Sequence, residues 1–273
     1  MMTTKNITLV YPVAGLSSRF GGKVKQFAPV GPNGETLIEV SLNQALKSNF
    51  KKIVFIVGEK TENLFKEKFG SSYKGIPIFY AKQSFNPSER DKPWGTCEAI
   101  LCAKSLINEP FVFCNGDDLY GENTFRIITD WVNKTNSPAA VGFDLNACVP
   151  ENGSVNRAIF SVNKENYVTE LVETIGIDRS KLKELNPTNK SLCSMNIFAL
   201  LPSTLDLLET KMNEFKNKHK GDRKSECYLP VELSNLIKEN KIKLKLLYTS
   251  DKWLGVTNPE DEEGVRKELA LIP

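Results

Sequence analysis

Short apolar runs alternate with segments of helical periodicity through the first half of the chain. The runs predicted as strands are 7–13, 52–58, 76–81 and 111–115. The segments predicted as helices, from apolar residues at roughly helical spacing, are 36–50, 61–69 and 96–106. The apolar residues of the strands follow one another without alternation, which is typical of a parallel sheet covered by helices on both faces.

The second half of the chain is less regular, although it contains the same kinds of element. The predicted strands are 139–146, 156–162, 167–173, 194–200 and 242–248. The predicted helices are 204–218, 229–239 and a short closing helix after Asn258. No linker rich in proline, glycine or serine separates the halves, and no internal repeat is visible, so we predict one domain over residues 1–273.

Charge and hydropathy exclude several classes of protein. The 273 residues include 36 Lys and Arg and 33 Asp and Glu, and the net charge of +3 gives no polybasic surface for nucleic acid. No apolar stretch approaches the roughly 18 residues of a membrane span, and the first apolar run is interpreted as a strand and not as a signal peptide. We therefore expect neither nucleic acid nor a membrane as a partner.

The cysteines and the histidine restrict the chemistry further. The six cysteines form no CxxC pair and five lie among apolar residues, which favours reduced core thiols in a cytoplasmic protein. The single histidine, His219, lies in a lysine-rich stretch and is interpreted as a surface residue. A Ser-His-Asp triad and a histidine-based metal site are therefore not expected.

Polar, glycine-bearing loops follow three of the predicted strands, at 14–26, 83–96 and 115–121. Ligands of open parallel sheets bind outside the carboxyl ends of the strands, so these loops are the candidate site. The first loop has three glycines that let backbone N–H groups approach an anion, and Arg19 and Lys25 add positive charge. It lacks the Walker A spacing, and its residues alone leave a phosphate site and an ordinary strand–helix turn open.

The segment Asn115-Gly116-Asp117-Asp118 directly follows a predicted buried strand. Two adjacent carboxylates at a strand end suit Mg²⁺, which binds one or two carboxylates together with phosphate oxygens. Asn, Gly and Asp are also the usual residues of a solvated turn, so the segment alone leaves both interpretations open.

Gln83 and the segment Gly95-Thr96 belong to the remaining loop. The Gln83 amide is suited to reading the edge of a base, and Thr96 is suited to capping a helix or to contacting a ligand beside free N–H groups. A surface amide and a plain helix cap are the alternatives, and each residue taken singly favours them.

Taken together, these segments resemble the nucleotidyltransferases of the sugar-1-phosphate type. Such enzymes carry an N-terminal AAGxGxRxG…PK-type loop, which corresponds to residues 13–22 and Lys25-Gln26. They also carry a Gln followed by Gly-Thr, matched by Gln83 and Gly95-Thr96, and a Gly-Asp pair, matched by Gly116-Asp117. The resemblance covers nearly the whole chain, because it continues through the segments 151–157, 194–196, 228–230 and 253–257.

The resemblance implies a single-domain, Rossmann-like α/β fold with a mostly parallel, mixed central sheet and helices on both faces. Within this nucleotidyltransferase domain, residues 1–125 would bind the nucleotide and residues 126–273 the acceptor. The implied reaction is Mg²⁺-dependent transfer of a nucleoside monophosphate from a nucleoside triphosphate to a sugar 1-phosphate or a similar phosphorylated acceptor, with release of pyrophosphate.

The resemblance also implies roles for individual residues. It implies nucleotide contacts from Val13, Ala14, Gly15, Gln83, Gly95 and Thr96, catalytic charges on Arg19 and Lys25, substrate contacts from Asn115, Glu173 and Asn196, and a metal ligand in Asp117. We expect Arg19 and Asp117 on the same rim of the sheet, within about 15 Å of each other, a span that a bound triphosphate and its metal would bridge.

Three positions depart from the pattern of that family. Val13 replaces the usual first alanine, and one extra residue before Lys25 makes Lys23 a competitor for the catalytic position. Gly255 stands where related enzymes often have an aspartate that completes the metal site. We therefore expect Asp251 to supply the second carboxylate to the metal, the alternative being a surface aspartate that pairs with the neighbouring lysine or caps the turn.

Other functions stay open from the sequence. A nucleotide-binding regulatory homologue without turnover is compatible with Gly255, and a cytidylyltransferase acting on a non-sugar phosphate would use the same loops. A glycosyltransferase shares the sheet and an acidic metal motif but does not explain Arg19 and Lys25 in the first loop. An oligomer is compatible with the sequence, which selects no particular one.

Overall fold

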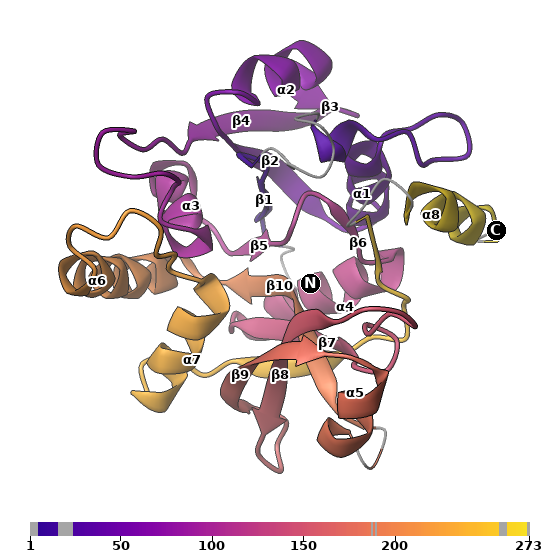
Figure 1. Cartoon of the computed structure of the whole chain (residues 1–273). Helices are drawn as coiled ribbons and strands as arrows, with labels where there is room; N and C mark the ends of the chain where they lie inside the picture. The colour runs from indigo at the N-terminus through magenta and orange to yellow at the C-terminus, as the bar shows by residue number, and fades with distance from the viewer. Residues whose placement is uncertain (1–4, 16–23, 187, 189, 257–260, 272–273) are drawn as a thin grey trace.

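A ten-stranded mixed β-sheet forms the centre of the protein (Figure 1). It is seen in a computed structural model that describes residues 5–15, 24–186, 188, 190–256 and 261–271. The order of the strands is β11-β7-β10-β5-β1-β2-β4-β3, in which β3 is the short edge strand Ser72–Tyr73; β8 pairs with β10, and β9 pairs with β8. The fold is thus the predicted α/β architecture, and its centre comes from strands of the first half of the chain.

The first half contributes four neighbouring parallel strands. They are β1 (Ile7–Pro12), β2 (Phe50–Val57), β4 (Ile76–Lys82) and β5 (Phe111–Phe113). The pairings β1–β2, β1–β5 and β2–β4 are all parallel, so the carboxyl ends of these strands lie at one edge of the sheet. The predicted strands are confirmed to within two residues at each end.

The second half extends the sheet beyond β5. Its strands are β7 (Ala139–Asp144), β8 (Val155–Val162), β9 (Val168–Ile177), β10 (Leu192–Leu200) and β11 (Lys245–Tyr248). Strand β10 runs antiparallel to both β5 and β7, whereas β11 is parallel to β7. Strands β8 and β9 form an antiparallel hairpin that pairs with β10 through β8, so this hairpin stands beside the end of β5.

Helices cover both faces of the sheet, as predicted. Their bounds are α1 (Leu37–Ala45), α2 (Glu62–Phe69), α3 (Thr96–Cys102), α4 (Glu122–Thr135), α5 (Arg179–Leu185), α6 (Pro202–Lys218), α7 (Leu229–Lys238) and α8 (Asp261–Ala270). Leu9 and Tyr11 of β1 pack into a core with α1, α2 and α4, whereas Val10 packs into a second core with α3, α6 and α7 (Figure 1). Successive side chains of a strand point to opposite faces, which explains the continuous apolar runs.

Several elements were not predicted from the sequence. Helix α4 was missed, although Phe125, Ile128 and Val132 are buried at helical spacing along it. Helix α5 and the short pair β6 (Asp118–Leu119) and β12 (Leu254–Gly255) were also missed. The helix predicted over 36–50 is wrong at its end, because α1 stops at Ala45 and residue 50 already begins β2.

The state of the thiols agrees with the sequence-based expectation, and the helices can be tested for membrane-spanning character. All six cysteines are free thiols, and all of them except Cys102 are buried. Among the described residues, no helix combines the length and the apolar character that a membrane crossing requires.

Candidate active site

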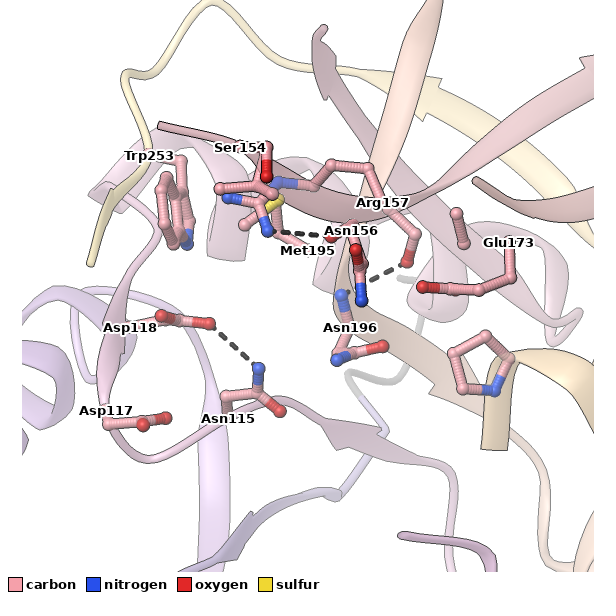
Figure 2. A pocket seen from close by; sticks show the side chains of 14 residues that line it. Asn115, Asp117, Asp118, Ser154, Asn156, Arg157, Glu173, Met195, Asn196 and Trp253 are labelled. Carbon is pink, nitrogen blue, oxygen red and sulfur yellow. Dashed lines mark hydrogen bonds between the residues drawn. The ribbon is translucent and has the colours of Figure 1, made fainter. Parts of the chain in front are cut away.

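A cavity of about 410 Å³ opens between the loop after β5 and the hairpin β8–β9 (Figure 2). Its walls come from that loop, from β8, β9 and β10, and from the segment before β12. The predicted residues that line it are Asn115, Asp117, Glu173 and Asn196. Figure 2 shows Asp117 and Asp118 on one side of the cavity and Glu173 on the other, so the two halves of the chain meet across it.

Lys25 and Asp117 are brought together at the sheet edge. The Lys25 Nζ lies 2.9 Å from Asp117 Oδ2, and the lysine side chain is only 13% exposed. Lys25 begins the 3₁₀ helix Lys25–Phe27, in the loop after β1, and Asp117 lies in the loop after β5. Because β1 and β5 are parallel neighbours, the two loops leave the sheet side by side. The structure therefore joins a predicted catalytic residue to the predicted metal ligand.

Asp118 is buried beside Asp117, and the pKa of its carboxyl group is raised. Its Oδ2 accepts hydrogen bonds from Asn115 Nδ2 at 2.9 Å and from the Tyr120 hydroxyl at 3.3 Å. Burial, together with repulsion from Asp117, raises the pKa of Asp118 from its ordinary 3.8 to about 7. A second negative charge in this place is therefore unfavourable unless a cation joins the site.

The raised pKa of Asp118 predicts a pH-dependent stability for the metal-free protein. A carboxyl group whose pKa is higher in the folded state stabilises that state fully below the unfolded pKa, and this contribution is lost as the pH rises through about 7. Asp118→Asn carries no charge, so its melting temperature relative to wild type should rise by a few degrees between pH 5 and pH 8 in EDTA. A difference that does not change with pH in thermal unfolding scans would contradict this assignment.

The hairpin and β10 supply the other side of the cavity. Burial raises the pKa of Glu173, and the nearby Arg157 guanidinium partly offsets the shift. Strand β10 is irregular between Ser194 and Phe198, and Asn196 has a φ of 59° there. This irregularity turns Asn196 into the cavity lining, and its backbone N–H donates to the Ser194 hydroxyl at 3.1 Å.

Gln83, Gly95 and Thr96 lie where the loop between β4 and α3 contacts the loop that precedes α7. The Gln83 Nε2 donates to Gly95 O and to Glu98 Oε2, both at 3.2 Å, which leaves the amide oxygen as the group available to a base. Gly95 has a φ of 96°, and a Cβ atom there would lie 2.7 Å from the Cys227 carbonyl oxygen. Thr96 does not cap its own helix, because its hydroxyl accepts from the Leu229 N–H at the start of α7.

Arg90 links these two loops by hydrogen bonds. It is 5% exposed, and its guanidinium donates to the carbonyl groups of Lys92, Asp222 and Ser225 at 3.0, 2.6 and 2.6 Å. It also lies 3.4 Å from the centre of the Trp94 ring. The loop that carries Gly95 is thereby held against the loop that precedes α7.

Arg90→Met should lower the free energy of unfolding by roughly 2–3 kcal/mol, because it leaves three carbonyl groups without their donor. Arg223→Met is the matched control, since Arg223 joins the same two loops through Asp91 and the carbonyl groups of Pro87 and Ser88 but is exposed. Its loss should cost about 1 kcal/mol or less. Urea unfolding measures both values, and equal losses would contradict the role given to Arg90.

Asp251 does not lie where the sequence suggested. The Asp251 Oδ2 accepts from the Thr124 N–H at 2.7 Å, in the first turn of α4, and the side chain lines a different cavity from Asp117. The structure therefore does not bring Asp251 to Asp117. Its carboxylate instead satisfies one of the free N–H groups at a helix N-terminus. Gly255 lies opposite Asp118 in the β6–β12 pair. The carboxylate beside Asp117 is that of Asp118, its neighbour in the sequence.

The predicted residues of the first loop are only partly described. Val13 is buried and its N–H donates to Ile56 O at 2.8 Å, while Ala14 is half-buried and Gly15 exposed at the end of β1. Arg19 and Lys23 lie outside the described residues, so the expected separation of Arg19 from Asp117 stays a prediction.

Sequence reasoning assigned no role to Arg157 and Trp253, both of which line the cavity. The only signal for them was that both lie within segments that carry the family resemblance. Their contact with each other depends on the pairing of distant strands, which no local pattern reveals.

The family of the protein follows from comparison with known sequences and structures. The model of the nucleotidyl transferase family matches residues 21–174, more than half of the chain, and the chain belongs to this family. A comparison with curated proteins finds no significant match.

Solved structures share the fold at low sequence identity. A UDP-glucose pyrophosphorylase in complex with UDP-glucose has a TM-score of 0.68 and 18% identity, over 97% of this chain and 98% of that one. An inositol-1-phosphate CTP transferase from T. maritima gives 0.66 and 13%, over 100% and 99%. A putative glucose-1-phosphate thymidylyltransferase from Bacillus anthracis gives 0.69 and 15%, over 98% and 96%.

Proposed function

We propose that the protein is a Mg²⁺-dependent nucleotidyltransferase that transfers a nucleoside monophosphate from a nucleoside triphosphate to a sugar 1-phosphate or similar phosphorylated acceptor. The observation that carries the proposal is that Asp117, which is paired with Lys25, and Asp118 line one cavity together with Glu173 and Asn196. Charged groups suited to phosphate chemistry face polar groups suited to hydroxyl recognition across this cavity.

The carboxylates of Asp117 and Asp118 fit a magnesium ion. Asp118 is costly to ionise beside Asp117, and a divalent cation relieves that repulsion. Among the described residues, no group of three or more His, Cys, Asp or Glu side chains could hold a metal ion. The ion would therefore need substrate phosphate oxygens as further ligands, which is the usual arrangement for Mg²⁺. When bound, it would supply positive charge for the triphosphate.

The proposed reaction needs positioning and charge rather than a general base. An oxygen of the acceptor phosphate, which is already ionised at neutral pH, forms a bond to the α-phosphorus of the triphosphate. The bond from that phosphorus to the pyrophosphate breaks, and pyrophosphate leaves with the electron pair. Lys25 would offset the negative charge that concentrates around the α-phosphorus, and Arg19 would assist it from the same loop. This chemistry accords with a chain that has a single histidine, outside the cavity.

The nucleotide and the acceptor would use different groups. We propose that the backbone of Val13, Ala14 and Gly15 approaches the nucleotide, and that Gln83 and Gly95 contact its base. Thr96 would act by keeping Gly95 in place, because its hydroxyl is already used by α7.

On the acceptor side, Glu173 and Asn196 would bind hydroxyl groups, and Asn115 would orient both Asp118 and the substrate. Free, mostly buried thiols also accord with a cytoplasmic enzyme, where thiols stay reduced.

Pyrophosphate release tests the proposal directly. The protein is incubated with Mg²⁺, with each nucleoside triphosphate in turn, and with a panel of phosphorylated acceptors that includes glucose 1-phosphate and inositol 1-phosphate. We expect release for at least one pair, abolished by EDTA and restored by Mg²⁺. Nucleotide binding without release across the whole panel would favour the regulatory homologue instead.

A further inference from the structure

Arg157 is the one cationic side chain among the described residues that line the cavity. It extends from β8, and none of the described acidic residues forms an ion pair with it within 4 Å. Its Nε donates to Cys148 O at 3.2 Å and its Nη1 to Asn156 O at 3.0 Å. A guanidinium has five N–H groups, so three remain without a partner among the described residues.

The charge around Arg157 is otherwise negative. Asp117, Asp118 and Glu173 line the same cavity, and Lys25 is already paired with Asp117. Arg157 lies opposite Thr174 in the β8–β9 pair, and Thr174 directly follows Glu173 in the sequence. The positive charge of Arg157 partly offsets the raised pKa of the Glu173 carboxyl group. A cation that is fixed among carboxylates but pairs with none of them is available to an anionic ligand.

Trp253 and Gly255 hold Arg157 in this position. The Arg157 Cζ lies 5.2 Å from the centre of the Trp253 ring, and Figure 2 shows the side chain reaching toward that ring. A Cβ atom on Gly255 would lie 2.3 Å from Cζ2 and 2.6 Å from Cη2 of Trp253, so the ring needs a glycine there. The Trp253 Nε1 is buried and interacts with the Asp118 carboxyl group, which lies on the same side of the cavity.

We propose that Arg157 binds the phosphate group of the acceptor, with Trp253 and Gly255 as its positioning residues; this rests on the proposed function. The planar guanidinium offers parallel N–H groups that match two oxygens of a phosphate, and its contact with the Trp253 ring limits its rotation. Its place between the aspartates and Glu173 puts the nucleophilic phosphate next to the reaction centre and the rest of the acceptor against Glu173 and Asn196. The substrate class is thus a phosphate monoester that also carries hydroxyl groups.

Arg157→Gln tests the assignment by separating acceptor affinity from nucleotide affinity. With the acceptor of the panel that gives the fastest pyrophosphate release, KM for that acceptor should rise roughly 10- to 100-fold. KM for the nucleoside triphosphate should change by less than about twofold, because binding energy for the nucleotide is independent of Arg157. Arg157→Lys should restore only part of the loss, since it keeps the charge but not the planar fork.

Gly255→Ala tests the positioning role. The added methyl group displaces the Trp253 ring, so acceptor KM should again rise, by less than in Arg157→Gln. Thermal unfolding and KM for the nucleoside triphosphate serve as controls for a general loss of structure. An unchanged acceptor KM in a folded Gly255→Ala protein would contradict the positioning role of the ring.

Calorimetric titration with glucose 1-phosphate, inositol 1-phosphate and unphosphorylated glucose keeps this test independent of turnover. Wild type should bind at least one of the two phosphate esters, and Arg157→Gln should bind it at least tenfold more weakly, by loss of charge-assisted hydrogen bonds. Equal binding by wild type and variant, binding of neither ester by wild type, or an effect confined to nucleotide KM would overturn the inference. If Arg157 controls ester binding while no pair of the panel releases pyrophosphate, the proposed function fails and the anion site stands.

Discussion

Asp117→Ala is expected to reduce Mg²⁺-dependent pyrophosphate release to below roughly a thousandth of the wild-type rate. Asp117 is the carboxylate that reaches both the cavity and Lys25, whose Nζ lies 2.9 Å away. Its loss would remove the main proposed protein ligand of the ion and would also release the lysine from its fixed place. Steady-state rates over a range of Mg²⁺ concentrations measure the effect, and titration with Mn²⁺ followed by electron paramagnetic resonance measures the loss of ion binding.

Asp118→Ala is the matched control for Asp117→Ala. Asp118 is buried and accepts hydrogen bonds from Asn115 and Tyr120. Its carboxyl group is therefore fully ionised only when a cation offsets the free-energy cost of a buried charge beside Asp117. We expect this variant to keep a measurable fraction of the rate and weaker ion binding. The opposite ranking of the two variants would mean that the metal register is shifted by one residue.

Lys25→Met is expected to lower kcat by roughly 10²- to 10³-fold, as the loss of one preorganised charge does at other oxyanion sites. The Lys25 side chain is largely buried beside Asp117, so water screens its charge only weakly. KM for the two substrates should change less than kcat, because the charge matters most when negative charge concentrates at the α-phosphorus. Rapid-quench or steady-state kinetics with the active pair of substrates provide the measurement.

Lys23→Met distinguishes the two lysines of the first loop. The extra residue before Lys25 left both as candidates for the catalytic position, and the structure pairs Lys25 with Asp117. We expect Lys23→Met to keep most of the wild-type kcat. If Lys23→Met loses the larger factor while Lys25→Met stays active, the catalytic charge belongs to Lys23 and the pair with Asp117 is structural.

Much of the fold could be predicted because the spacing of apolar residues along the chain indicates which faces of each strand or helix are buried. The runs at β1, β2 and β5 are apolar on both faces, which is what a sheet covered on both sides requires. Helix α4 carries the same kind of signal, since Phe125, Ile128 and Val132 form a buried stripe at helical spacing. The end of α1 was placed five residues late because propensity does not fix where a helix stops.

The sequence by itself determined which loops carry glycines, carboxylates and basic residues, and the order of the strands that precede them. It could not determine how Asp118, the acid next to Asp117, is buried. That depends on the pairing of Asp118 with Gly255, two positions far apart along the chain, and on the packing of Trp253 in the space that Gly255 leaves.

Asp251 illustrates the same limit. Its neighbours in the sequence suggest an acid at the active-site edge, but the N-terminus of α4 lies within reach and its free Thr124 N–H binds the carboxylate. Local periodicity specifies which face of an element is buried, because burial acts on each residue separately. Which side chains meet across a cavity is decided only when distant strands pair and fix the directions of their side chains, and this is tertiary structure.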